Sequence, residues 1–263
     1  MRELKLNSEK SPENISRRIF HKARFGVDKF VLVQRYKIHY VEAGQGEPVI
    51  LIPGSYNTQR TWKRLMPLLA GEFHILALDY IGNMDSSKSR ETPEFTLQEQ
   101  TNLLAQMVQQ IRLAKVNLIG GYSGGATAYD FAARYPELTL KIVSLEGSLI
   151  QSDQANSSPD FSFKFKKTLR TPWYKINLGR KSTQNFEEEA KSIKAPLLYL
   201  FGTRSDAKRI QLPENLEYLK TNLPHAWVVA LEGSIYNLNT QKPQDIADII
   251  LEFLRKKLIP RNN

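Results

Sequence analysis

Short apolar runs alternate with helical patterns along most of the chain. Residues 49–52 and 116–119 are continuously apolar, which is typical of strands buried on both faces. Residues 103–111 instead have apolar side chains at every third or fourth position, which predicts an amphipathic helix. Alternating strands and helices predict an α/β fold class, a mostly parallel twisted sheet with helices on both faces. Further strands are predicted at residues 75–78, 142–145, 197–201 and 227–231.

Both ends of the chain depart from this alternation. Apolar and polar positions alternate over residues 31–40 around a polar turn, which predicts a β-hairpin. Residues 1–28 show no such pattern and are interpreted as an N-terminal arm. Near the other end, apolar side chains between residues 246 and 254 form one helical stripe. The predicted α/β core therefore comprises residues 29–147 and 195–263.

The segment between these two parts, residues 148–194, is polar, aromatic and basic. It is longer than an ordinary connection between core elements, so we expect a short lid insertion. Its aromatic side chains, Trp173 among them, would form an apolar wall against a ligand, and its basic side chains would meet an acidic group or a lipid surface. The simpler interpretation is an amphipathic lid with a solvated outer face.

Composition narrows the class of protein. The chain has 263 residues, of which 41% are hydrophobic, and no apolar run approaches the roughly 20 residues of a membrane span. The polar N-terminus lacks the apolar core of a signal peptide, so a cytoplasmic location is expected. The absence of cysteine excludes disulfides, thiolate metal sites and cysteine nucleophiles. Neither a metal nor an organic cofactor is expected.

The formal net charge of +10 allows two interpretations. The first is solubility combined with a basic tail at each end of the chain. The second is attraction to an anionic ligand, a membrane surface or nucleic acid. No nucleic-acid-binding motif accompanies the charge, so the expected partner is a small-molecule substrate or ligand and not nucleic acid. Weak contact with an anionic surface and the choice between monomer and homodimer stay open.

A glycine-rich turn carries the candidate chemistry. Residues 121–125 read Gly-Tyr-Ser-Gly-Gly, a G-x-S-x-G pattern between a predicted strand and a predicted helix. In this setting Ser123 is expected to adopt a strained backbone that exposes its hydroxyl as a nucleophile. Gly121 and Gly125 are expected to be glycines because a side chain at either position would collide with neighbouring elements. The helix N-terminus would then stabilise an oxyanion.

From about residue 31 to residue 254, the chain resembles the α/β-hydrolase superfamily, in the branch of esterases, epoxide hydrolases and haloalkane dehalogenases. This resemblance implies an oxyanion hole formed by the backbone N–H groups of Ser55 and Gly124, with Gly54 and Tyr122 near the substrate. Besides the turn at Ser123, it rests on residues 38–44 (IHYVEAG), 51–55 (LIPGS), Trp62, 78–82 (LDYIG) and 133–137 (ARYPE).

The same resemblance exposes departures at the other catalytic positions. The family order is Ser, then Asp or Glu, then His. The acid is expected at Asp206, one residue later than the family's usual place, with Glu146 as the alternative. Counting back from Pro243 places Tyr236 where the family keeps its histidine. A further glycine of the family is replaced by Met84.

The replacement by Tyr236 makes ordinary hydrolysis doubtful. A phenol with a pKa of about 10 does not readily accept the serine proton at neutral pH. The sequence therefore favours, without establishing, an enzyme acting on a small, mostly apolar ester, lactone or similar molecule, with non-hydrolytic chemistry included. The alternatives are a catalytically silent ligand-binding or scaffold protein, and a conventional hydrolase whose base is unrecognised.

Overall fold

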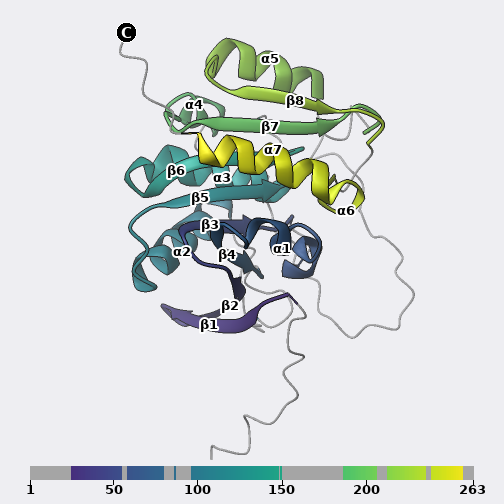
Figure 1. The fold of residues 1–263 in the computed structure, drawn as a ribbon. Coiled ribbons are helices and arrows are strands. Elements are labelled where there is room, and N and C mark those ends of the chain that lie inside the picture. The colour runs from purple at the N-terminus through teal and green to yellow at the C-terminus, as the bar shows by residue number, and fades with distance from the viewer. Residues whose placement is uncertain are drawn as a thin grey trace, which may run out of the picture.

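The computed structural model describes residues 25–54, 58–79, 86, 96–147, 149, 186–205, 212–234 and 238–256. Within these residues, eight strands form one sheet in the order β1-β2-β4-β3-β5-β6-β7-β8 (Figure 1). The strands are β1 (Val27–Val33), β2 (Tyr36–Ala43), β3 (Glu47–Ile52), β4 (Phe73–Leu78), β5 (Val116–Gly121), β6 (Thr139–Leu145), β7 (Leu197–Gly202) and β8 (Trp227–Leu231).

The sheet is mostly parallel, as predicted. β1 and β2 form the expected antiparallel hairpin, whose turn places Gln34 at a φ of 54°. β2 also pairs antiparallel with β4, and every later pairing, from β3–β4 to β7–β8, is parallel. The parallel strands therefore present their carboxyl ends at one edge of the sheet, where α/β proteins place their ligands.

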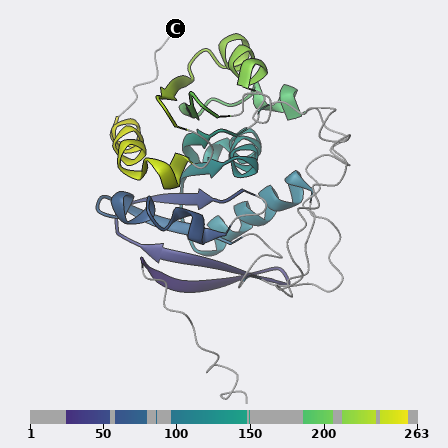
Figure 2. The same cartoon turned by 90° about the vertical axis from the view of Figure 1, so that its right-hand side faces the viewer.

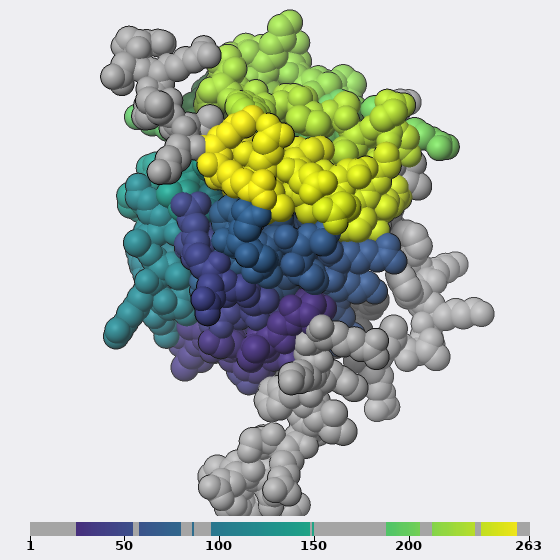
Figure 3. All heavy atoms as spheres, in the orientation of Figure 1, coloured from purple at the N-terminus to yellow at the C-terminus, as the bar shows by residue number. Residues whose placement is uncertain are grey.

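Helices cover both faces of the sheet (Figure 2). Side chains of α2, α3, α4 and α5 belong to the core cluster on one face. Those of α1, α6 and α7 belong to the cluster on the other face, and in the space-filling view the yellow C-terminal helices pack against the blue residues around α1 (Figure 3). The helical elements are η2 (Gln59–Trp62), α1 (Met66–Leu69), α2 (Leu97–Gln110), α3 (Ser123–Arg134), η3 (Pro136–Leu138), α4 (Phe186–Ala190), α5 (Leu212–Asn222), α6 (Leu238–Gln241) and α7 (Pro243–Arg255).

Local sequence explains where the two longest helices begin. At the start of α2, Thr96 Oγ1 accepts the backbone N–H of Glu99, whose carboxylate accepts the backbone N–H of Thr96. This reciprocal capping satisfies N–H groups that no helical carbonyl reaches. α7 begins at Pro243, a position where proline's missing N–H costs nothing. The predicted stripe of α7 is confirmed, because Ile246 and Ile250 are fully buried.

The two described ends of the predicted lid pack against the core. Leu149 is buried, and its N–H donates to Asn215 Oδ1 at 2.7 Å. In α4, Glu189 accepts a hydrogen bond from Arg134 of α3 at 2.6 Å. Residues 150–185, which include Trp173, lie outside the described residues. At the N-terminus, β1 begins inside the predicted arm, and no helix of the described residues is long and apolar enough to cross a membrane.

Candidate functional site

The turn between β5 and α3 has its strained residue at Tyr122. This residue has φ and ψ angles of 54° and −118°, which only glycine adopts readily. Ser123 follows as the first residue of α3. Two backbone hydrogen bonds hold the turn: Tyr122 N–H donates to Leu145 O, and Gly125 N–H donates to Tyr122 O, each at 2.9 Å. The expectation that Ser123 carries the strained backbone is therefore wrong by one residue.

The glycines that the turn requires also lie one residue earlier than predicted. A Cβ atom on Gly120 would lie 2.2 Å from Gly124 O, and one on Gly124 would lie 2.3 Å from Ile52 O. A Cβ atom on Gly121 would meet only the ring of Trp62, with Cη2 at an ordinary 3.6 Å. The expected steric need for glycine at position 121 is therefore wrong. The two required glycines lie two residues before and two residues after Tyr122.

A third close approach agrees with one part of the sequence prediction. A Cβ atom on Gly125 would lie 2.8 Å from both Gly147 Cα and Ser144 Oγ, so this position does require glycine. The reason is helix-to-sheet packing, because Gly147 and Ser144 belong to the end of β6 and the residues after it. Gly125 therefore supports α3 without marking the centre of the turn.

The shift of the turn changes what the predicted catalytic atoms can do. Ser123 is half-buried in the first turn of α3, and Thr127 Oγ1 donates to its carbonyl oxygen at 3.3 Å. The predicted oxyanion donor is the backbone N–H of the residue that follows the centre of the turn. With Tyr122 at the centre, that residue is Ser123 and not Gly124. Gly124 is buried against the end of β3. Ser55, the other predicted oxyanion donor, lies outside the described residues. The roles of Ser123, Ser55 and Gly124 stay predictions.

Glu146 is the described candidate acid, and it is held firmly. It follows β6 directly, has a φ of 56° and is 2% exposed. Its Oε1 accepts the N–H of Gly202 at 3.1 Å and the hydroxyl of Ser205. Ser205 occupies the place where the family usually has its aspartate, so in this chain that turn donates a hydrogen bond to Glu146. Asp206 lies outside the described residues, and its role stays a prediction.

A buried phenol, Tyr199, lies near this carboxylate, and a second buried phenol, Tyr129, lies near Tyr199. Burial, and then the nearby charge of Glu146, raise the pKa of Tyr199 above its usual value. Burial, and then the neighbouring Tyr199, raise the pKa of Tyr129 well above its usual value. Both phenols therefore keep their protons at neutral pH, so neither serves as a general base.

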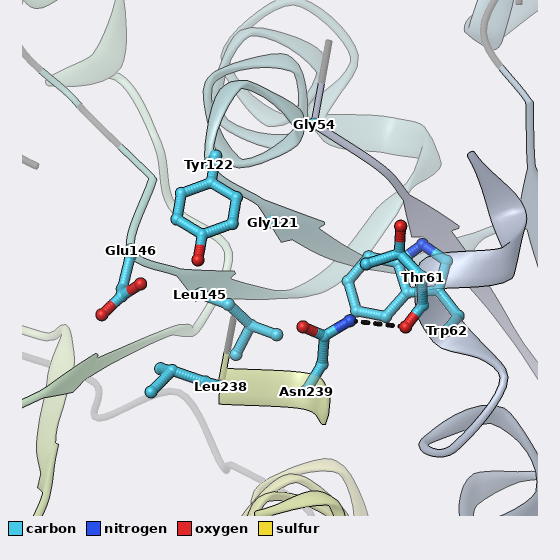
Figure 4. Close-up of a pocket in the computed structure, with 9 residues that line it drawn as sticks. All are labelled: Gly54, Thr61, Trp62, Gly121, Tyr122, Leu145, Glu146, Leu238 and Asn239. Carbon is cyan, nitrogen blue, oxygen red and sulfur yellow. Dashed lines mark hydrogen bonds between the residues drawn. The ribbon is translucent and has the colours of Figure 1, made fainter. Parts of the chain in front are cut away.

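A small pocket opens beside the strained turn (Figure 4). Tyr122 and Glu146 lie at one end, and at the other end Asn239 Nδ2 donates to Thr61 O at 2.9 Å. The space holds about one water-sized group. The predicted substrate contacts Gly54 and Tyr122 both line it, whereas Ser123 does not. Its lining residues are Gly54, Thr61, Trp62, Gly121, Tyr122, Leu145, Glu146, Leu238 and Asn239.

Sequence reasoning missed part of this lining. Trp62 appeared only as a motif of the resemblance, although its position shortly after a strand end could have indicated a pocket wall. No sequence pattern marked Thr61, Leu238 or Asn239 as pocket residues. Leu238 and Asn239 belong to α6, which reaches the pocket through tertiary packing alone. Glu146 was predicted only as the alternative acid, because it lies just past a predicted strand at a position that some branches of the family use.

No histidine of the described residues lines the pocket. His39 is buried between two carboxylates, with Nδ1 2.7 Å from Asp79 Oδ2 and Nε2 3.0 Å from Asp28 Oδ1. Asp79 also accepts the N–H of Gln59 at 2.8 Å, so this network anchors the start of η2. His225 is exposed just before β8. Tyr236 and Met84 lie outside the described residues, and their roles stay predictions.

Metal binding finds no support in the described part of the chain, which contains no group of three or more His, Asp or Glu side chains arranged around one point. Glu146 contributes a single carboxylate to the pocket.

Comparison with known proteins identifies the architecture. A family model described as the alpha/beta hydrolase fold matches residues 47–176. The chain is 30% identical over 136 residues to a haloalkane dehalogenase of Agrobacterium fabrum, an alignment covering 52% of this chain and 44% of that protein. It is 28% identical over 252 residues to Lipase 3 of a Moraxella species, covering 80% of this chain and 78% of that lipase. The chain spans less than half the length of several curated relatives it matches.

Solved structures agree on the fold. A crystal structure of a membrane phospholipase A superposes with a TM-score of 0.74 at 22% identity, covering 92% of this chain and 88% of that chain. At this identity the likeness concerns the fold alone. The predicted α/β-hydrolase architecture is confirmed.

Proposed function

We propose that this chain, which belongs to the α/β-hydrolase fold superfamily, binds a small molecule beside Tyr122 and does not hydrolyse it through Ser123. The relatives are hydrolases, and their activities belong to them. One observation carries the proposal: the strained position between β5 and α3 is occupied by Tyr122, and Ser123 is already helical.

The backbone strain supports a role for the Tyr122 side chain. A residue other than glycine in such a conformation costs of order 1–3 kcal/mol, and strain of this kind clusters at ligand-binding and active sites. The phenol of Tyr122 lines the pocket together with Glu146. A phenol with a pKa of about 10 is a hydrogen-bonding group at neutral pH and a poor nucleophile without a base.

The expected replacement of the catalytic histidine points the same way. If Tyr236 occupies that place, no imidazole is supplied there, and no histidine of the described residues lines the pocket. Removing one member of a Ser-His-acid set lowers turnover by roughly 10⁴-fold or more. If both the nucleophile and the base are replaced by tyrosine, the pocket can still bind a ligand but lacks the groups that hydrolysis needs.

Hydrolysis is the second candidate, and Glu146 favours it. A buried carboxylate fixed by Gly202 and Ser205 at the end of β6 has the position and rigidity that a catalytic acid needs. In this alternative, Ser123 attacks a small apolar ester or lactone, with Tyr236 and either Asp206 or Glu146 completing the site. The lipase among the relatives is consistent with an ester substrate.

A fluorophosphonate probe separates the two candidates. The folded chain should show no labelling above that of Ser123→Ala, and no turnover of short p-nitrophenyl esters above the same variant. Labelling that disappears in Ser123→Ala would show that Ser123 is an activated nucleophile and would remove the proposal. Intact-protein mass spectrometry reads the label directly, and circular dichroism checks that both proteins are folded.

A gain-of-function pair tests the position of the nucleophile. Tyr122→Ser combined with Tyr236→His places a serine at the strained position and an imidazole at the expected base position. We expect esterase activity from this double variant, and none when Tyr236→His is made alone. Activity in the single Tyr236→His variant would show that Ser123 is the nucleophile after all.

A further inference from the structure

Glu146 uses only part of its hydrogen-bonding capacity. Its Oε1 accepts from the Gly202 backbone and the Ser205 hydroxyl, whereas Oε2 is buried and has no hydrogen-bond partner among the described residues. An ionised carboxylate has about four acceptor sites on its two oxygens. Nearly half of the bonds that this side chain could accept are therefore open, on a residue that is 2% exposed.

No cation compensates this carboxylate within the described part of the chain. None of the described lysines, arginines or histidines forms an ion pair with Glu146, and the nearby Tyr199 is neutral. A buried charge without a counter-charge is costly, and so is a buried acceptor without a donor. A ligand that supplies both a positive charge and N–H donors would remove both costs together.

The rest of the pocket suits a small head group on an apolar stem. Leu145, Leu238 and the ring of Trp62 supply apolar surface, and the ring of Tyr122 lies beside Glu146 (Figure 4). Aromatic faces attract cations as well as apolar groups. The water-sized space matches an ammonium group, whereas a guanidinium or a quaternary ammonium is larger.

We propose that the pocket binds a primary alkylamine in its protonated form, with the ammonium group donating to Oε2 of Glu146. The ammonium group fills the water-sized space, so the alkyl stem extends outward from between the apolar side chains of the lining. The inference rests on the proposed function in one respect, since it names the ligand class of the same pocket.

Four small probes of matched size test this assignment: n-butylammonium, butan-1-ol, butyrate and tetramethylammonium. Binding is followed by isothermal calorimetry and by ligand-observed NMR on the full chain at neutral pH. We expect n-butylammonium to bind at least tenfold more tightly than butan-1-ol, and butyrate and tetramethylammonium to show no binding. Charge-assisted hydrogen bonds are the stronger ones, which accounts for the ranking.

Two variants locate the site. Glu146→Gln should weaken n-butylammonium binding at least tenfold, whereas Glu137→Gln, which makes the same charge change at an exposed position on η3, should leave it unaltered. Should Glu146→Gln fail to fold, Leu238→Phe fills the pocket while Glu146 remains, and it should weaken binding as well. Equal affinity for the amine and the alcohol, or binding that both pocket variants retain, overturns the inference.

The outcome is separable from that of the proposed function. Amine binding together with serine-dependent ester hydrolysis would overturn the proposed function and leave the amine site standing. Absence of amine binding in a chain that fluorophosphonate does not label would overturn the amine site and leave the silent pocket standing.

Discussion

Gly120 and Gly121 are neighbours in β5 with opposite expected responses to substitution by alanine. The methyl group of Gly120→Ala would lie 2.2 to 2.5 Å from three backbone atoms of Gly124 and Gly125. None of these atoms belongs to a flexible side chain, so relief requires movement of the first turn of α3. The methyl group of Gly121→Ala would meet only the ring of Trp62, at 3.6 and 3.8 Å, which is ordinary contact.

These geometries give magnitudes of opposite sign. Overpacking of a closed site costs about 1–3 kcal/mol, and a rigid backbone neighbour places Gly120→Ala at about 3 kcal/mol. At a compatible position, replacing glycine by alanine restricts the unfolded chain and stabilises the fold by about 0.4–1 kcal/mol. For a chain of this size, a loss of about 3 kcal/mol lowers the Tm by roughly 6–12 °C, whereas Gly121→Ala should raise it by about 1–4 °C.

Thermal unfolding followed by circular dichroism, together with urea midpoints, measures both variants against the parent. Gly124→Ala serves as a second closed position and should resemble Gly120→Ala, because its methyl group would lie 2.3 Å from Ile52 O. If Gly121→Ala were as damaging as Gly120→Ala, the turn would be centred on Ser123, and Tyr122 would not be its strained residue.

Three further substitutions have expected outcomes. Tyr122→Gly removes the backbone strain and should raise the free energy of unfolding by about 1 kcal/mol in urea titrations while abolishing amine binding; a loss of stability would show that the strain is small. Burial and the charge of Glu146 raise the pKa of Tyr199 in the folded chain. The protonated phenol therefore contributes its full share of stability below the unfolded pKa of about 10, and this share is lost as pH rises through the folded pKa. Tyr199→Phe should therefore reduce the loss of urea stability between about pH 8 and about pH 11, and an unchanged loss would exclude this phenol as the cause. Thr96→Ala should lower stability by about 1 kcal/mol and Thr96→Ser by much less, and equal losses would show that the hydroxyl cap to Glu99 is unimportant.

The sheet could be predicted from the sequence because short, continuously apolar runs between helical patterns are typical of buried parallel strands. Residues 49–52 and 116–119 lie within β3 and β5, where their side chains are almost wholly buried. Helices α2 and α7 were equally visible, since burial of one face imposes a period that single substitutions do not hide. Their exact ends depended on capping, as at Thr96.

The centre of the glycine-rich turn could not be predicted with the same certainty. Gly120 with Gly124, and Gly121 with Gly125, have the same spacing, so the pattern fits Tyr122 and Ser123 equally well as central residues. The presence of a serine favoured the second choice. The φ and ψ angles of Tyr122 and the close approaches of Gly120 and Gly124 distinguish the two, and the approach of Gly124 to Ile52 depends on how α3 packs against β3.

The pocket was the least predictable part, because it joins elements far apart in the chain. Asn239 of α6 reaches Thr61 before α1, and Glu146 reaches Gly202 at the end of β7. No local sequence pattern predicts such long-range contacts. Glu146 was named as the alternative acid because it lies just past a predicted strand, at a position that some branches of the family use, but its hydrogen bond from Ser205 was not anticipated.

The close approach of Gly124 to Ile52 O has a consequence for how proteins of this architecture change over time. The atoms involved belong to the backbone, so the demand for glycine is independent of which residue occupies the strained position. The residue at the strained position can therefore change while the surrounding glycines stay, because replacing those glycines would require the helix to move. A motif search that relies on the glycine spacing therefore detects the backbone geometry of the turn and does not report which residue occupies its strained position.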